Sequence, residues 1–286
     1  MSSLKNKLAI VTGASRGAGR AIAAVLGEAG VTVYVTGRTA RNAPAVDDLP
    51  GTIDDTADEV TARGGHGIAV HCDHTVDHEV EALFERVRAE HGRLDLLVNN
   101  VWGGYEHQAF GIPMTPFWQQ PRSQWESMFV AGMRAQLVAS QLAAPLMITQ
   151  PGGLIVSTVA WAYDEYLRNI YYDLSKAAVI RMTHGMAHDL RPHGTAAIAV
   201  APGFMRTERI LAAHAAHPFD LSITESPEYL GRAVRALAED VNVMEKSGRL
   251  FTVGDLAGEY GFTDIDGRQP AAFRFPTSPA PGSAGG

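Results

Sequence analysis

Short apolar runs alternate along the chain with longer segments in which apolar residues recur every third or fourth position. The runs predict β-strands, and the 3.6-residue period of the longer segments predicts amphipathic helices. The predicted strands span residues 8–13, 31–37, 67–73, 94–100, 152–160 and 195–203. The predicted helices span residues 19–30, 54–65, 77–92, 122–149 and 170–192. Strands that are apolar throughout are buried on both faces, so we expect an α/β fold with a Rossmann-type, doubly wound parallel sheet and helices on both faces.

Two long segments interrupt this alternation, at residues 38–50 and 101–121. The chain shows no internal repeat and no second domain, so residues 1–275 are predicted to form a single domain. The last segment, 276–286, is rich in Pro, Gly, Ser and Ala, and we predict that it is disordered.

Composition and charge narrow the kinds of partner. Hydrophobic residues make up 46% of the 286 residues and charged residues 19%, which is typical of a soluble globular protein. The net charge of -7 gives no general attraction to nucleic acid or to an anionic membrane. No apolar stretch approaches the roughly 20 residues of a membrane span. Cys72 is the single cysteine, so no internal disulfide can form, and we expect a cytoplasmic protein with no nucleic-acid or membrane partner.

The stretch TGASRGAG (12–19) lies where the first predicted strand meets the first predicted helix. Gly13 permits a sharp turn, Gly17 lets the backbone approach a pyrophosphate, and Gly19 lets helix and strand pack closely. Ser15 lies in the same turn, and the first N–H groups of the helix face the anion. The stretch therefore predicts a dinucleotide site, against the alternative of a tight turn that binds no ligand.

The end of the second strand indicates which dinucleotide would bind. An Asp or Glu at this place binds a free ribose 2′-hydroxyl, but this chain has Thr36 and Gly37 there, followed by Arg38. Together with Arg16 of the glycine turn, Arg38 could hold a 2′-phosphate through charge-assisted bidentate hydrogen bonds. The alternative for Arg38 is a solvated loop arginine. We predict NADP(H) in preference to NAD(H).

Tyr172 and Lys176 stand four residues apart and so share one face of a predicted helix. A phenol with a pKa of about 10 needs a drop of roughly three units, or about 4 kcal/mol, to act as an acid and base near neutral pH. One ammonium at ~4 Å contributes on the order of 4 kcal/mol at an effective dielectric near 20. Tyr171 has Ser175 at the corresponding position, so Tyr172 is the better candidate. The alternative is an ordinary surface pair.

These motifs, in this order, resemble those of a single-domain short-chain dehydrogenase/reductase over roughly residues 5–210. The matching pieces are TGASRGAG, Asp73 after the third strand, the pair NN at 99–100, YDLSK, and APGFMRT at 201–207. The later stretch VGDLAGEYGFTDIDG and the pair Phe117-Trp118 resemble more narrowly the branch around dehydrogenase/reductase member one.

The resemblance implies a role for each matching residue. Tyr172 would protonate a carbonyl oxygen, or remove the proton of an alcohol, while Lys176 holds the nicotinamide ribose and lowers the pKa of Tyr172. The other implied cofactor contacts are Asp73 at the adenine, Asn99 on the adenosine side, and Met205 and Thr207 along the nicotinamide half. The resemblance also implies a homodimer or homotetramer built on the helices at 122–149 and 172–192.

The chain departs from the family pattern at the serine expected about thirteen residues before the tyrosine. Val159 and Ala160 occupy that place and carry no hydroxyl. Ser157 and Thr158 are the nearest hydroxyls, each about 6.5 Å deeper along the strand. We favour Ser157 as the third catalytic residue. The alternative is that both are strand residues satisfied by the backbone.

Two further departures lie near the same site. Gly132 replaces the asparagine that the family has in its long fourth helix, at a cost of about 1 kcal/mol against alanine; close packing or an ordered water would explain it. Val101 and Trp102 stand where small residues are usual, and Trp102 either narrows the mouth of the site or belongs to the core.

Aromatic residues are frequent in the loop at 101–121 and shortly after the fifth strand. They are Trp102, Tyr105, Phe110, Phe117, Trp118, Trp161, Tyr163 and Tyr166. They could line a pocket for a bulky apolar carbonyl compound, or the loop could fold onto its own aromatics. The histidines show no metal-ligand spacing, and we predict no metal site.

We therefore predict an NADP(H)-dependent oxidoreductase that transfers a hydride between the nicotinamide and a ketone, aldehyde or secondary alcohol. The alternative is an NADP(H)-binding sensor or regulatory protein of the same fold with little turnover, and the losses at Gly132 and at 159–160 motivate it. Enoyl reduction is a lesser possibility, because that branch spaces its tyrosine and lysine more widely.

Overall fold

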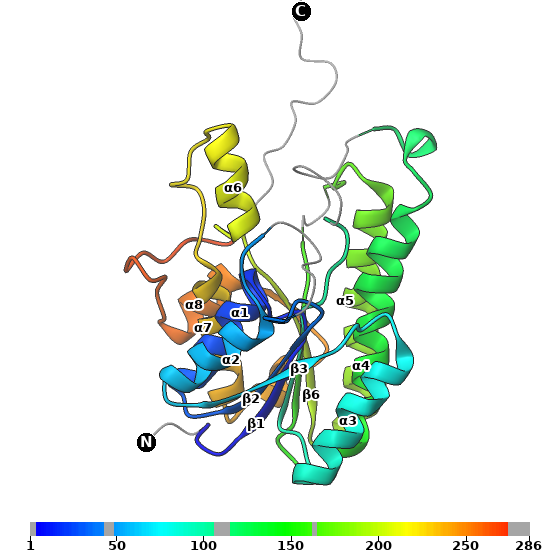
Figure 1. The fold of residues 1–286 in the computed structure, drawn as a ribbon, viewed down its shortest axis with the longest axis vertical. Helices are drawn as coiled ribbons and strands as arrows, with labels where there is room; N and C mark the ends of the chain where they lie inside the picture. The colour runs from blue at the N-terminus through cyan, green and yellow to red at the C-terminus, as the bar shows by residue number, and fades with distance from the viewer. Residues whose placement is uncertain (1–3, 43–48, 106–114, 162–164, 274–286) are drawn as a thin grey trace, which may run out of the picture.

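A parallel sheet of seven strands forms the centre of the protein, in the order β3-β2-β1-β4-β5-β6-β7 (Figure 1). The structure is a computed structural model that describes residues 4–42, 49–105, 115–161 and 165–273. The strands are β1 (Leu8–Val11), β2 (Thr32–Gly37), β3 (His66–His71), β4 (Leu96–Asn99), β5 (Leu154–Thr158), β6 (Ala196–Ala201) and β7 (Leu250–Thr252). The tail predicted to be disordered, Phe110 and Tyr163 lie outside the described residues.

Helices cover both faces of the sheet, as predicted for a doubly wound fold. One face is covered by α1 (Gly17–Glu28), α2 (Ile53–Ala62), α7 (Pro227–Glu239) and α8 (Val253–Tyr260). The other is covered by α3 (Asp77–His91), α4 (Ala135–Met147) and α5 (Ile170–Leu190). Helix α6 (Glu208–Ala216) stands beyond the carboxyl ends of the strands (Figure 1). None of the helices in the described segments has both the length and the apolar character needed to cross a membrane.

Alternation along the strands explains why they are apolar throughout. In β1, Ala9 and Val11 pack into the core on the α1 side, whereas Leu8 and Ile10 pack into the core on the α3 side. Ile10 pairs with Tyr34 of β2, and both side chains belong to the same core. Because side chains alternate along a strand, a sheet buried on both faces needs an apolar residue at every position.

The long helix predicted at 122–149 consists of two parts. The π-helix η2 spans Trp125–Arg134, and α4 continues from Ala135. A π-helix is wider than an α-helix and usually appears only as a short bulge near functional sites. Gly132 lies in this segment and faces the ring of Trp102. Beyond residue 203, where the periodicity assigns no element, the structure adds α6, α7, β7 and α8. Within the described residues, short 3₁₀ helices also occur at 117–119, 191–193 and 243–246.

Candidate active site

A cavity of about 650 Å³ opens at the carboxyl ends of the central strands. Strand order reverses between β1 and β4, and this switch point is where doubly wound sheets bind their ligands. Of the thirteen residues predicted to be catalytic or cofactor-binding, ten line the cavity: Gly13, Ser15, Arg16, Gly17, Arg38, Asp73, Tyr172, Lys176, Met205 and Thr207. Gly19, Asn99 and Ser157 lie outside its lining.

The glycine turn has the backbone geometry that its glycines permit. Gly13 and Gly17 have φ values of +63° and +56°, in the left-handed region. A Cβ added at Gly19 would overlap the carbonyl oxygen of Gly13, so helix α1 could not pack against the turn with a larger residue there. The N–H of Gly17 donates to a carboxylate oxygen of Glu208 over 2.9 Å. The turn therefore already receives an anionic oxygen, as binding of a phosphate requires.

Two arginines flank the end of β2. Arg16 donates from Nε to the carbonyl oxygen of Pro50 over 3.1 Å and from Nη2 to that of Gly51 over 3.2 Å. Arg38 Nη1 lies 3.8 Å from a carboxylate oxygen of Asp73. Both guanidinium groups border the cavity, and both contact other parts of the chain.

Asp73 and His74 follow β3 at the same edge. Burial opposes ionisation of Asp73, but hydrogen bonds from the Thr75 N–H and hydroxyl, with the charge of Arg38, hold its pKa below the ordinary value. Burial lowers the pKa of His74 to about 4, so its imidazole is neutral near pH 7. His74 Nε2 shares a hydrogen bond of 2.8 Å with the hydroxyl of Thr36. His74 was not predicted as a site residue, although it lines the cavity.

Asn99 and Ser157 form a buried pair behind the cavity. They are partners in the β4–β5 register, and Asn99 Nδ2 donates to Ser140 Oγ over 2.8 Å and to Ser157 Oγ over 3.5 Å. Both side chains are fully buried. The structure thus does not bring Ser157 or Asn99 to the site.

The next residue of each strand lines the cavity instead. Asn100 Nδ2 donates to the carbonyl oxygens of Thr12 and Gly13, which ties the loop after β4 to the glycine turn. Thr158 donates to Asn100 Oδ1 over 3.3 Å. Successive side chains of a strand face opposite sides of the sheet. Asn99 and Ser157 therefore point into the core, whereas Asn100 and Thr158, one position later, border the cavity.

Tyr172 lies in the first turn of α5, where Asn169 caps the helix by accepting from the Tyr172 N–H over 3.0 Å. Its hydroxyl lies 3.5 Å from that of Tyr105. Lys176, one turn later, has its Nζ 3.4 Å from the centre of the Trp102 ring and 5.3 Å from the centre of the Tyr172 ring.

The charge states of this pair differ from those expected. Burial raises the pKa of Tyr172 well above 10, and Tyr105 raises it further. Burial lowers the pKa of Lys176 to about 7. The pKa of Tyr172 is thus shifted in the direction opposite to the one expected from Lys176, because burial is the largest influence on the phenol. That Lys176 lowers the pKa of Tyr172 stays a prediction.

A buried acidic residue, Glu225, holds the loop that carries Met205 and Thr207. Glu225 accepts the N–H of Gly203 over 2.8 Å, and burial raises its pKa to about 7. Its backbone bonds with Phe204 and Arg206, so residues 203–206 run alongside it. Thr207 caps α6 by accepting the N–H of Ile210.

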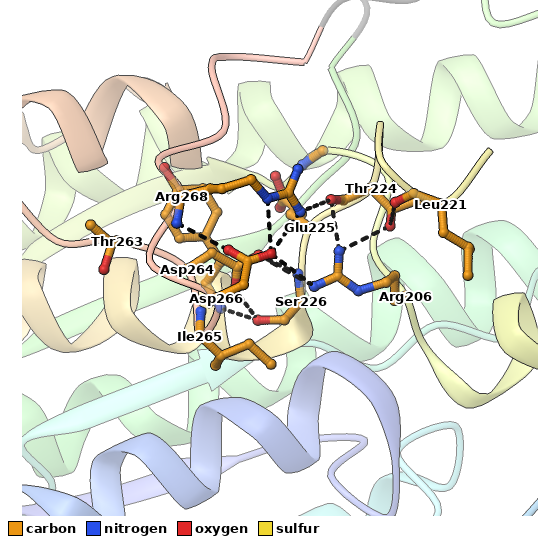
Figure 2. Close-up of polar contacts among 12 residues, drawn as sticks. Arg206, Leu221, Thr224, Glu225, Ser226, Thr263, Asp264, Ile265, Asp266 and Arg268 are labelled. Atoms are coloured by element: carbon orange, nitrogen blue, oxygen red, sulfur yellow. Dashed lines mark hydrogen bonds and ion pairs between the residues drawn. The ribbon is translucent and has the colours of Figure 1, made fainter.

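A network of acidic and basic side chains holds this support in place (Figure 2). Asp264 accepts the N–H and the hydroxyl of Ser226, and Arg206 Nη2 lies 3.6 Å from Asp264. Arg268 pairs with Asp266 over 2.8 Å and donates to the carbonyl oxygen of Ser222. The stretch GFTDIDG, noted from the sequence, thus contacts the segments that precede and follow α6.

The aromatic residues divide into two groups. Trp102, Tyr105 and Trp161 line the cavity. Phe117 and Trp118 contact each other edge to face and are 62% and 71% exposed, so they stay outside it. Within the described ranges, no group of three or more His, Cys, Asp or Glu side chains could hold a metal ion.

Sequence reasoning also missed Glu208 and Arg209, which line the cavity from the start of α6. An acidic residue directly after Thr207 is the ordinary signature of a capped helix, and that was the available signal. Its contact with Gly17 joins residues 191 positions apart, which no local pattern predicts.

The sheet order and the glycine turn define a nucleotide-binding fold, and the Tyr172–Lys176 pair lines its cavity. Comparison with known proteins agrees: the family model for short chain dehydrogenases matches residues 7–216. Dehydrogenase/reductase SDR family member 1 of Mus musculus is 37% identical over 277 residues, which cover 93% of this chain and 85% of the relative. The 7alpha-hydroxysteroid dehydrogenase of Escherichia coli (strain K12) is 32% identical over 208 residues, 72% of this chain and 74% of that enzyme.

Solved structures show the same fold. A putative dehydrogenase from Xanthomonas campestris has a TM-score of 0.79 and 26% sequence identity, over 95% of this chain and 97% of that chain. The chain therefore belongs to the short-chain dehydrogenase family, whose fold binds a nicotinamide cofactor at this edge of the sheet.

Proposed function

We propose that the chain is an NADP(H)-dependent carbonyl reductase or alcohol dehydrogenase, which transfers a hydride between the nicotinamide and a ketone, aldehyde or secondary alcohol. One observation carries the proposal: Tyr172, Lys176 and the glycine turn all face a single cavity. The Gly17 N–H, which receives a carboxylate oxygen in this structure, fits a cofactor phosphate.

Tyr172 acts as the proton donor in the reductive direction. Its raised pKa keeps the phenol protonated near neutral pH. A bound nicotinamide cofactor would supply the hydride. Tyr172 would give its proton to the carbonyl oxygen of the substrate, which on reduction becomes a stronger base than a phenolate. Lys176, as an ammonium, stabilises the phenolate that remains and can donate to the cofactor ribose.

The third hydroxyl of the site is that of Thr158. It lines the cavity, whereas Ser157 is buried against Asn99. We assign to Thr158 the hydrogen bond to the substrate oxygen that the sequence suggested for Ser157.

Cofactor preference depends on Arg16 and Arg38. Both border the cavity at the end of β2, and no acidic residue stands in that strand end to bind a free 2′-hydroxyl. Their side chains can turn toward a 2′-phosphate, which supports NADP(H) over NAD(H). Replacing Arg38 with Asp should shift the ratio of kcat/KM values toward NADH; an unchanged ratio would remove Arg38 from the cofactor site.

The substrate is proposed to be a bulky apolar carbonyl compound or the matching alcohol. Trp102, Tyr105 and Trp161 give the cavity aromatic walls. A hydroxysteroid, the substrate class in the name of the Escherichia coli relative, is an alcohol of this kind. A homodimer or homotetramer built on α4 and α5 and a cytoplasmic location belong to the same proposal.

Loss of NADPH absorbance with a panel of ketones, aldehydes and quinones tests the proposal. Tyr172→Phe should lower kcat by about 10³-fold, because the proton donor is lost, and should leave the Kd for NADPH unchanged. Tyr171→Phe is the matched control and should retain turnover. If the protein binds NADPH but reduces no member of the panel, it is a cofactor-binding sensor. Equal rates for Tyr172→Phe and the native protein would exclude the mechanism.

A further inference from the structure

Lys176 is a buried lysine that has no acidic partner among the described residues. It is 8% exposed, and within the described part of the chain it makes no ion pair. A buried ammonium that lacks a counter-charge is costly, and burial alone lowers its pKa to about 7. A contact that favours the ammonium would offset this cost.

An aromatic face lies directly against this ammonium. The Nζ atom is 3.4 Å from the centre of the Trp102 ring, well within the roughly 6 Å of an effective cation–π contact. Tryptophan is the strongest partner for such a contact, and desolvation strengthens it. The indole N–H has no hydrogen-bond partner among the described residues, so the ring face is the part of Trp102 that interacts.

Two glycines make room for the indole. A Cβ at Gly132 would lie 2.8 Å from Cζ3 and 2.9 Å from Cε3 of Trp102, which is closer than real Cβ atoms approach. A Cβ at Gly104 would overlap Cζ2 of the same ring. The ring also contacts Tyr172 edge to face, with centres 5.3 Å apart at 90°. Its orientation is thus fixed by the loop after β4, by the π-helix η2 and by α5.

Among the described residues, the titratable groups that line the cavity with Lys176 include two phenols. Tyr172 belongs to the same helix, and Tyr105 belongs to the loop after β4. Burial raises the pKa of each, so neither is an anion near neutral pH. The charge of Arg209, at the start of α6, acts on Tyr105.

We propose that Trp102 is a positioning residue that holds Lys176 in its ammonium form beside Tyr172, and that Gly132 is the residue that makes its place. This assignment explains together the two departures that the sequence showed at 102 and 132. Its effect on turnover depends on the proposed function, but the interaction itself does not.

The interaction is measurable without cofactor or substrate. The chain has four lysines, Lys5, Lys7, Lys176 and Lys246, so a lysine-labelled sample gives four side-chain NMR signals to follow against pH. Loss of one signal in Lys176→Arg assigns Lys176. Trp102→Leu keeps apolar bulk but removes the aromatic face, and should lower the Lys176 pKa by about one unit. Trp102→Phe keeps an aromatic face and should lower it by less than about half a unit.

The role of Gly132 follows from a double-mutant cycle. Gly132→Ala alone displaces the indole, so it should lower the Lys176 pKa as Trp102→Leu does. Added to Trp102→Leu, the same change should have no further effect. Lys5, Lys7 and Lys246 serve as internal controls and should titrate as in the native protein. A Lys176 pKa that is unchanged or raised in Trp102→Leu overturns the proposal, and additive effects of the two changes overturn the role of Gly132.

The pH profile of reduction gives the second readout. Because Lys176 must be charged, kcat/KM should fall as the pH rises through its pKa, and Trp102→Leu should move that fall about one unit lower. If Trp102→Leu shifts the Lys176 pKa measured by NMR but leaves the pH profile of kcat/KM unchanged, Trp102 has no role in turnover. If the native protein reduces nothing, the proposed function fails, whereas the titration still decides the interaction.

Discussion

Neighbouring residues at the ends of β4 and β5 face opposite sides of the sheet. Ser157 and Asn99 turn into the core, while Thr158 and Asn100 border the cavity. Which hydroxyl borders the cavity is therefore decided by the direction in which a strand residue points, and not by which residue type is more usual at that place.

The opposite orientations of Ser157 and Thr158 lead to a kinetic prediction. Thr158→Val removes the hydroxyl at constant shape and should lower kcat/KM for carbonyl reduction by about 10²-fold, as loss of one oxyanion donor does. Thr158→Ser should retain most of the activity. Ser157→Ala should cost about 1 kcal/mol of stability through its bond with Asn99, with kcat/KM nearly unchanged. A larger kinetic loss in Ser157→Ala than in Thr158→Val would return the role to Ser157.

Helix α6 is connected at both ends to parts of the site. At its start, Glu208 accepts the N–H of Gly17 in the glycine turn. Before and after it, residues 203–206 and 222–226 are joined through Glu225, Arg206 and Asp264 (Figure 2). The helix is thus held by the same turn that would receive a cofactor phosphate.

Glu208 and a cofactor phosphate would compete for that N–H. Glu208→Gln keeps the hydrogen-bond acceptor and removes the negative charge, so the Kd for NADPH should fall about fivefold, or about 1 kcal/mol for a partly exposed charge. Isothermal titration calorimetry measures it. Glu228→Gln, which removes an acid from the first turn of α7, is the matched control and should leave the Kd unchanged. Weaker binding in Glu208→Gln would mean that Glu208 does not oppose the cofactor.

The stability of the whole molecule depends on groups that burial keeps neutral. His74 has an ordinary pKa of 6.5 that burial lowers to about 4 in the folded protein. Below about pH 6.5 the unfolded chain binds a proton at His74 that the folded chain does not bind. The free energy of unfolding therefore decreases as the pH is lowered, until the folded form is also protonated near pH 4.

Urea unfolding at about pH 7 and about pH 5 measures this contribution. His74 should account for about 2 kcal/mol of the stability lost between them. His74→Gln can still bond with Thr36 but does not titrate, so its loss over the same interval should be smaller by that amount. An equal loss in both proteins would show that His74 is not the group responsible.

Much of the fold could be predicted because its causes are local. The central strands are apolar at every position, and the glycine turn needs glycine at particular backbone angles. Strand β7 could not be predicted: it has three residues, and two of them are only partly buried. The wide turns of η2 could not be predicted either, since the spacing of apolar residues indicates a helix without distinguishing a π-helix from an α-helix.

The site could be predicted in its members but not in its electrostatics. The spacing of Tyr172 and Lys176 predicted that the two residues lie together. The same spacing says nothing of their burial, which is the largest influence on the pKa of each. Trp102 lies 74 positions before Lys176 in the sequence, and their contact exists only because the loop after β4 meets α5 at the edge of the sheet. Contacts of that range are set by the tertiary structure.

Strand β7 and the Asp264–Arg268 segment lie beyond residue 216, where the match to the family ends. A chain shortened to that boundary would leave β6 as the outermost strand, with unpaired backbone groups open to a second molecule. It would also take away the acidic partners of Arg206 and leave the Gly203 N–H unsatisfied. The region that the family model matches is therefore not a unit that can be transplanted, and swaps with relatives should carry the described residues beyond 216 along.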